Sequence, residues 1–235
     1  MPVIAVALAC ITLAAVIIPA LRAAWFGVNR FQDDAFYYIV TARHFIESGT
    51  FSFDGVTATN GFQPLWMAIV VGLLKVSGAH ASPESVVFAV VAAEKTCLVV
   101  AVACAVAFFV RAQRAQMPWR TGFLAIALVL LCPFYVVFEQ GMETTLAALA
   151  LVLALQCLVT RRPVALGFAL AFLFLCRLDS GVFIGLPILA WVVVQHDWPA
   201  RIKVISALPL LVAIACDVAI NFAMTGHTVP ISGAM

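Results

Sequence analysis

The sequence predicts an all-α membrane protein with about seven transmembrane helices and two further helices that lie on the membrane surface. Apolar residues make up 65% of the 235-residue chain, and only 10% of the residues are charged. The mean hydropathy is +1.14. Because soluble domains carry roughly 25% charged residues, this composition excludes an ordinary globular domain and indicates a polytopic membrane protein. No basic cluster indicates nucleic acid as a partner.

Seven apolar segments are predicted to cross the membrane, since a hydrocarbon core of about 30 Å needs about 20 apolar residues in a helix. They comprise residues 3–21, 86–110, 121–138, 144–160, 164–176, 182–194 and 204–220. The first segment lacks a preceding basic region and a small-residue cleavage site, so we interpret it as a retained span rather than a signal peptide. The fifth and sixth segments are short, which favours little tilt or a place inside the bundle.

The interpretation of residues 64–76, a shorter apolar run that contains Lys75, decides the topology. This length is typical of a helix on the membrane surface. If the run does not cross, seven of the thirteen basic residues fall in short loops on one side, as the positive-inside rule requires, and eight of the eleven acids fall on the other. The sequence therefore predicts a multi-pass protein of the cell membrane with a cytoplasmic N-terminus and an extracytoplasmic C-terminus.

The first outer loop, residues 22–85, is predicted to hold both surface helices within a single module of residues 1–235. The first helix is expected over residues 33–48, with Gly49 as its stop signal. Asp54 and Gly55 indicate a turn. The second helix is expected to begin at Pro64, and its Trp66 is expected at the level of the lipid headgroups.

Two adjacent acids, Asp33 and Asp34, open this loop beside the membrane, where unpaired charge is costly. Neighbouring carboxylates either raise one pKa, which suits a general base, or share a bound divalent cation such as Mg²⁺ or Mn²⁺. The alternative is helix capping, because acidic residues are favoured in the first turn of a helix.

Further polar residues are predicted to meet on the same outer face as the two aspartates. They are Glu139 and Glu143 in the second outer loop, Arg177 and Asp179 in the third, and Asn221, His227 and Ser232 near the C-terminus. Acids that activate a hydroxyl, together with a cation that binds phosphate, are what transfer from a lipid-phosphate donor requires.

Each of these residues also has a structural interpretation. Arg177 could pair with Asp179, and Glu143 could be an N-terminal acid of the following helix. Lys95 either reaches a donor phosphate or extends its ammonium group to the headgroups, and it is not expected to form a simple pair with its neighbour Glu94. Asp217 is either a site residue or a polar tie between helices. The spacing of the histidines gives no metal site.

The pattern of Asp33-Asp34 followed by aromatic residues, a polar turn and the segment Gln63-Pro64-Leu65-Trp66 resembles the first outer loop of GT-C glycosyltransferases. The relevant group includes the protein O-mannosyltransferases and the aminoarabinose transferases. The resemblance covers the chain at the level of topology and implies a seven-span module with two juxtamembrane helices in this loop. It also implies that the sequence lacks the C-terminal part of the full-length family.

The resemblance assigns roles to individual residues. Asp33 would be the base with Asp34 beside it, although the family's usual pair is Asp-Glu, and Glu143 and Arg177 would contact the donor. The implied reaction is inverting transfer of a sugar from a polyprenyl-phosphate donor, in contact with membrane lipid, to a hydroxyl of an unidentified acceptor. Two rival interpretations are an ion-coupled transporter that uses Glu94, Lys95 and Asp217, and a membrane subunit without catalytic activity.

Overall fold

The computed structural model describes residues 31, 33–78, 81–114, 141–194, 198–228 and 230. These residues are mostly helical, and no strand occurs among them. The predicted spans at residues 3–21 and 121–138, together with Glu139 and Ser232, lie outside the described residues. The helices are α2 (Asp33–Ser48), α3 (Pro64–Ser77), α4 (Pro83–Arg114), α6 (Thr144–Val159), α7 (Pro163–Cys176), α8 (Leu178–Ser180), α9 (Leu186–Val194) and α10 (Ala200–Thr225), with a π-helical turn, η2 (Gly181–Gly185), between α8 and α9.

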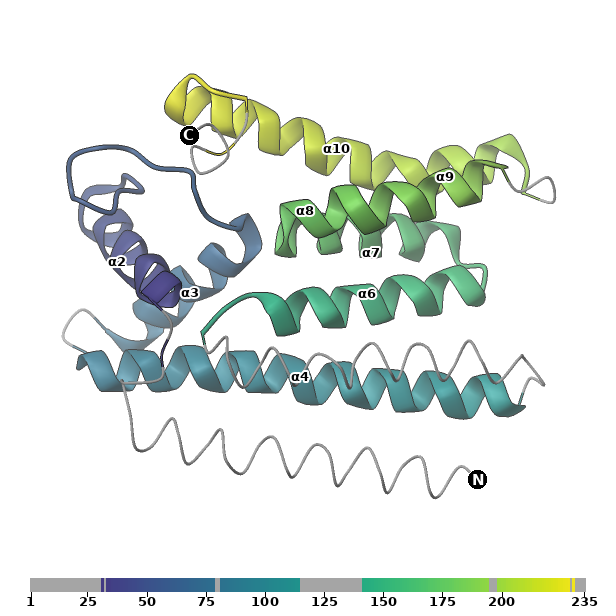
Figure 1. Ribbon diagram of the computed structural model, residues 1–235, viewed down its shortest axis with the longest axis horizontal. Coiled ribbons are helices and arrows are strands. Elements are labelled where there is room, and N and C mark those ends of the chain that lie inside the picture. The colour runs from purple at the N-terminus through teal and green to yellow at the C-terminus, as the bar shows by residue number, and fades with distance from the viewer. Residues whose placement is uncertain are drawn as a thin grey trace.

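The longer helices form a bundle, and α2 and α3 lie together at one end of it (Figure 1). Neighbouring helices in the bundle pack in the order α4, α6, α7 and α10, with α9 beside η2 and α10. The N-terminal ends of α4, α6 and α8 and the C-terminal ends of α7 and α10 all lie at the end that carries α2 and α3 (Figure 1). This end of the bundle therefore collects loops that are far apart in the sequence.

Two of the described helices are long and apolar enough to cross a membrane. They are the segment Pro83–Phe108 of α4 and the whole of α10, each of 26 residues, with mean hydropathies of 2.2 and 2.1. The predicted count of seven spans is not confirmed. Helix α6 has 16 residues and α7 has 14, which at 1.5 Å per residue gives about 24 and about 21 Å, short of a hydrocarbon core of about 30 Å.

The N-terminal helices have the bounds that the sequence indicated. Helix α2 begins at Asp33, with both aspartates in its first turn, and ends at Ser48. Gly49 follows with a φ of 78°, a conformation that glycine adopts without steric cost, and its N–H donates to the Phe45 carbonyl. Helix α3 begins at Pro64, where the missing N–H of proline costs no helical hydrogen bond.

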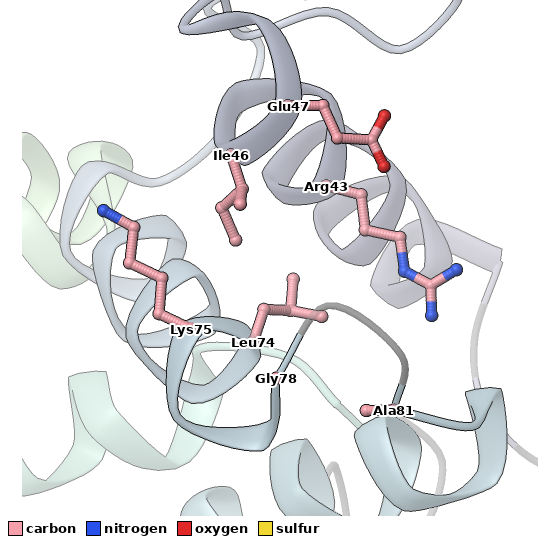
Figure 2. A pocket seen from close by; sticks show the side chains of 7 residues that line it. All are labelled: Arg43, Ile46, Glu47, Leu74, Lys75, Gly78 and Ala81. Carbon is pink, nitrogen blue, oxygen red and sulfur yellow. The ribbon is translucent and has the colours of Figure 1, made fainter.

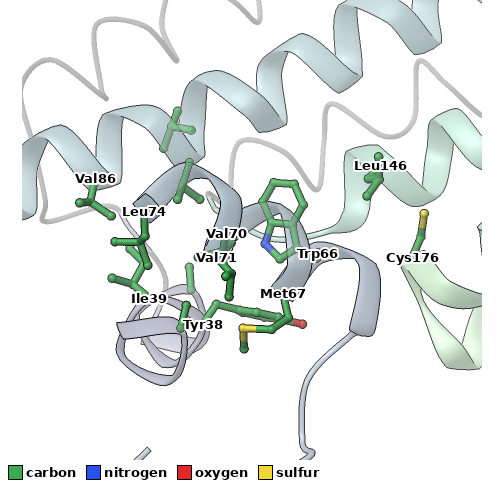
Figure 3. Close-up of a cluster of buried hydrophobic side chains, with 14 of the residues drawn as sticks. Tyr38, Ile39, Trp66, Met67, Val70, Val71, Leu74, Val86, Leu146 and Cys176 are labelled. Atoms are coloured by element: carbon green, nitrogen blue, oxygen red, sulfur yellow. The ribbon is translucent and has the colours of Figure 1, made fainter. Parts of the chain in front are cut away.

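Helices α2 and α3 are joined to the bundle by a large apolar cluster (Figure 3). Trp66 and Met67 of α3 are at its centre and are almost completely buried, and Leu146 of α6 and Cys176 of α7 also belong to it. The expectation that Trp66 lies among lipid headgroups is therefore wrong. Its ring is buried and its indole N–H donates to the Gly141 carbonyl at 3.0 Å, because a buried indole N–H needs an acceptor inside the protein.

Candidate functional site

A buried carboxylate, Glu143, lies where α2 meets the start of α6. Glu143 precedes α6 as its N-cap residue, but its side chain caps no helical N–H. Instead its Oε2 accepts a hydrogen bond from the Tyr38 hydroxyl at 3.2 Å. The Tyr38 oxygen in turn accepts the Gln63 backbone N–H at 3.0 Å. The interpretation of Glu143 as a simple N-terminal acid of the helix is therefore incomplete, because its carboxylate also ties α6 to the first outer loop.

The third loop completes this arrangement, which we call the Glu143 cluster (Tyr38, Gln63, Glu143, Arg177 and Asp179). Arg177 Nη1 lies 4.0 Å from Glu143 Oε1, and Arg177 Nε lies 3.1 and 3.2 Å from the two Asp179 carboxylate oxygens. The Leu178 N–H donates to Gln63 Oε1 at 2.9 Å. Predicted residues from two separate loops, Glu143 from one and Arg177 and Asp179 from the other, thus meet at one place. The alternative pairing of Arg177 with Asp179 is also present.

The cluster combines a buried and an accessible part. Only 3% of the Glu143 side chain is exposed, against 36% for Arg177 and 52% for Asp179. Burial, and next the negative charge of Glu143, raise the pKa of Tyr38 well above the ordinary value for tyrosine. Tyr38 therefore remains protonated at neutral pH and can donate to Glu143, while Arg177 is the cation that an incoming anion can reach.

The predicted catalytic pair, Asp33 and Asp34, is exposed in the first turn of α2. Their place in the first turn fits the helix-capping alternative, because the helix dipole favours acids there. Among the described residues, no hydrogen bond or ion pair to either carboxylate is present. The two acids differ in helical register, because residues four apart share a face. Asp34 lies on the face of Tyr38, whereas Asp33 lies on the face of Tyr37, whose hydroxyl bonds to Thr59 instead.

Lys95 is not exposed to a donor, contrary to expectation. Its side chain is 5% exposed, and its ammonium nitrogen lies 3.0 Å from Glu94 Oε1. The two neighbours therefore do pair, but the pair is not self-contained, because Glu94 Oε2 also accepts the Gly141 N–H at 2.9 Å. In a segment apolar enough to cross a membrane, a buried ion pair avoids the cost of two separate charges.

Asp217 lies in the C-terminal half of α10, and His227 follows the end of that helix. Of the two, Asp217 has a side chain that takes part in a hydrogen-bond network. Asn60 of the first outer loop donates to Asn221 Oδ1 at 3.2 Å, and Asn221 donates to Asp217 Oδ2 at 3.0 Å. This network ties the loop to α10, which agrees with the structural interpretation of Asp217. His227 is exposed and its backbone N–H bonds to Thr225, so the structure places it at the same end of the bundle but outside the Glu143 cluster.

An apolar cavity of about 600 Å³ lies between α3, α7 and α10. Its lining is apolar except at one group of polar residues, Asn60, Asp217 and Asn221. The residues of the Glu143 cluster are not part of this lining. Two lining residues are close to the cluster in sequence, because Pro64 follows Gln63 and Leu175 precedes Arg177 by two residues.

A smaller cavity of about 230 Å³ lies between the C-terminal halves of α2 and α3. Ile46 and Leu74 face each other across it, and the charged groups of Arg43 and Lys75 lie on opposite sides (Figure 2). None of the predicted site residues lines it. It is therefore separate from the Glu143 cluster.

Sequence reasoning overlooked Tyr38 and Gln63, which connect the predicted residues. The available signal was the position of Tyr38, four residues after Asp34 on the otherwise apolar face formed by Ala35, Ile39 and Ala42. A tyrosine on such a face needs a hydrogen-bond partner. Within the described ranges, no group of three or more His, Cys, Asp or Glu residues is arranged to hold a metal ion.

The comparisons with known proteins add no relative to this picture. No family model matches the chain, and neither a curated protein nor a solved structure is similar to it.

Proposed function

We propose that this chain is a membrane glycosyltransferase that moves a sugar from a polyprenyl-phosphate donor to an acceptor hydroxyl on the outer face of the membrane. The observation that carries the proposal is an apolar cavity of about 600 Å³ whose lining residues Pro64 and Leu175 lie one and two residues in sequence from Gln63 and Arg177 of the Glu143 cluster. The resemblance to GT-C enzymes in the first outer loop supports the same reaction.

The cavity and the cluster suit opposite ends of one amphiphilic donor. Pockets of several hundred Å³ with an apolar lining bury chain-like ligands, and a few polar groups fix their orientation. The first part of an isoprenoid tail inside the cavity, with its phosphate at the edge formed by Pro64 and Leu175, would bring that phosphate toward the loop that carries Arg177. Guanidinium groups bind phosphate oxygens through paired N–H donors, so Arg177 is the proposed phosphate ligand.

Binding of the phosphate has to compete with a bond that already exists. Arg177 Nε is within hydrogen-bond distance of both Asp179 oxygens, and Asp179 is more exposed than Arg177. We expect the donor phosphate to displace Asp179, since an exposed ion pair contributes little free energy. Glu143, which Tyr38 holds in place, would then face the sugar hydroxyls as an acceptor.

The chemical step is a single displacement at the anomeric carbon. A carboxylate of Asp33 or Asp34 takes the proton of the acceptor hydroxyl, whose oxygen bonds to the anomeric carbon as the bond from that carbon to the phosphate oxygen breaks. The electron pair leaves with the polyprenyl phosphate, whose charge Arg177 offsets. Attack opposite the leaving group inverts the configuration. The resemblance favours Asp33 as the base, and the register of α2 favours Asp34.

The test measures donor binding and sugar transfer with the chain in lipid nanodiscs. We expect Arg177→Gln to weaken binding of undecaprenyl phosphate by about tenfold or more, the loss of one charge-assisted contact. Arg43→Gln is the matched control, because Arg43 is a partly exposed arginine in the smaller cavity and should leave binding unchanged. Equal binding by the wild type and Arg177→Gln would contradict the proposed phosphate site.

Transfer of labelled sugar from polyprenyl phosphate to membrane acceptors then identifies the base. Either Asp33→Asn or Asp34→Asn should abolish transfer while donor binding stays within about twofold, since general-base catalysis contributes about 10²-fold or more. The inactive variant names the base. Transfer that survives in both variants would overturn the mechanism.

The transporter remains the second candidate because of one observation, the buried Glu94 and Lys95 pair inside a potential span. Proton or solute flux into proteoliposomes without any lipid-linked sugar would support it. Absence of flux, together with transfer, would leave the glycosyltransferase.

A further inference from the structure

The segment that carries Glu143 is held in place at Gly141, two residues before it. The Gly141 N–H donates to Glu94 Oε2 of α4 at 2.9 Å, and the Gly141 carbonyl accepts the Trp66 indole N–H of α3 at 3.0 Å. Both backbone groups of one residue are thus bound by buried side chains of two different helices. We call this arrangement the Gly141 clamp (Trp66, Glu94, Lys95 and Gly141).

The clamp also restricts Gly141 sterically. Its φ is 88°, which glycine adopts far more readily than other residues. A Cβ atom on Gly141 would lie 2.6 Å from Phe31 Cζ and 2.8 Å from Ala35 Cβ. The start of α2, which carries the two aspartates, therefore packs directly on the same glycine.

Glu94 is anchored independently of Gly141. Lys95 donates to its Oε1 at 3.0 Å, and the Glu94 backbone carbonyl accepts the Thr145 hydroxyl of α6 at 3.0 Å. Its side chain is only 1% exposed. A buried carboxylate whose two oxygens bind different partners has a fixed orientation, so it can fix the position of the amide that it accepts.

From this geometry we infer that Glu94, oriented by Lys95, is a positioning residue that sets where Glu143 and the start of α2 stand relative to each other. The inference rests on the proposed function in one respect only, which is the role of Glu143 as an acceptor for the sugar hydroxyls. Lys95 neutralises Glu94 and does not bind the donor. Neither residue contacts the reacting atoms in this assignment, and both act through Gly141.

Two double variants separate the hydrogen bond from the burial of charge. Glu94→Gln with Lys95→Met removes both charges but keeps an oxygen that accepts the Gly141 N–H. Glu94→Leu with Lys95→Met removes both charges and the acceptor. Both variants remove the two members of this ion pair together, so a difference between them in exchange at the Gly141 amide reports on the acceptor that only the glutamine retains.

The first readout is hydrogen exchange resolved at the Gly141 amide in nanodiscs. We expect exchange about tenfold or more faster in the leucine variant than in the glutamine variant, the equivalent of one lost buried hydrogen bond. Equal exchange rates at the Gly141 amide in the two variants would overturn the inference, and this outcome does not depend on the proposed glycosyltransferase activity. Trp66→Phe, which removes only the indole donor, should also speed exchange, and unchanged exchange there would exclude the second arm of the clamp.

The second readout is donor binding and transfer with the same variants. We expect the glutamine variant to retain both and the leucine variant to bind the donor about tenfold more weakly or to transfer about tenfold more slowly. Faster exchange without any change in binding or transfer would confirm the clamp and count against the proposed role of the Glu143 cluster. The two failures are therefore distinguishable.

Discussion

The end of the bundle that carries α2 and α3 is held differently from the contact between α7 and α10. At the α2 and α3 end, hydrogen bonds join side chains and backbone groups that are as much as 165 residues apart in sequence. The contact between α7 and α10 depends on close apolar packing. There Gly167 lies so near Pro209 and the Ser206 carbonyl that a Cβ atom would come within 2.8 Å of both.

The difference follows from what each region has to do. Apolar packing is not directional, so it joins two helices without fixing the direction of any particular polar group. Hydrogen bonds to buried groups depend on angle and distance, and leaving one unmade is costly. Among the described residues, most of the buried polar side chains therefore lie where loops have to be positioned, and the buried Ser206 of the contact between α7 and α10 is an exception. Where helices only have to approach, a small residue such as Gly167 allows the contact.

The largest effect is expected for Gly141→Ala at the polar end. The positive φ and the contacts with Phe31 and Ala35 should together lower the free energy of unfolding by about 2 to 4 kcal/mol. Thermal unfolding in detergent measures this loss. Gly49→Ala is the matched control, because Gly49 has a φ of 78° with no atom within 4 Å of its Cβ position. Equal losses in both variants would show that the crowding at Gly141 contributes nothing.

A smaller effect is expected for Gly167→Ala in the contact between α7 and α10. Overpacking against Pro209 should cost about 1 to 3 kcal/mol, offset by about 0.5 to 1 kcal/mol from the better helix propensity of alanine. Gly185→Ala is the control, since the Cβ of an alanine at position 185 would meet only Leu210 of α10, at 3.8 Å. If the two regions are independent, Gly167→Ala lowers the melting temperature and leaves hydrogen exchange at Gly141 unchanged. Faster exchange there would contradict the separation.

The smallest effect is expected in the exposed turn of the first outer loop. The N–H groups of Thr57 and Val56, and the Ser52 hydroxyl, donate to Asp54 and hold the pKa of its carboxyl well below the ordinary value. Because the folded pKa is depressed, the stabilising contribution is present above the unfolded pKa of about 3.9 and is lost as the pH falls through the lower folded pKa.

Hydrogen exchange of residues 52–59 between pH 7 and pH 3 is the measurement. In the wild type we expect the turn to stay protected below pH 4, and in Asp54→Asn we expect slightly faster exchange that no longer depends on this carboxyl. Glu47→Gln, also exposed, should behave as the wild type. Equal protection of the turn at pH 7 in Asp54→Asn and in the wild type would show that the charge of Asp54 does not stabilise it.

Much of the local structure could be predicted from the sequence. The bounds of α2, its stop at Gly49 and the start of α3 at Pro64 follow from preferences that act within a few residues. Glu143, Arg177 and Asp179 were predicted to share one face, and in the structure Arg177 lies near both acids. That prediction came from the distribution of charge between loops, which constrains which loops share a side. The bounds of α6 and α7 agree within one residue with the predicted segments 144–160 and 164–176. Their predicted role as membrane spans is not confirmed, since apolar composition alone does not distinguish a short span from a buried helix.

The sequence by itself determined an apolar, helical chain with a helix that opens on two aspartates. The tertiary structure decided which of these polar groups are buried and what they bind. Glu94 and Lys95 pair, Trp66 is buried rather than at an interface, and Tyr38 reaches a carboxylate 105 residues away. A helix forms from local contacts, but a buried polar group takes its partner from whatever element packs against it, and that is settled only when the helices meet.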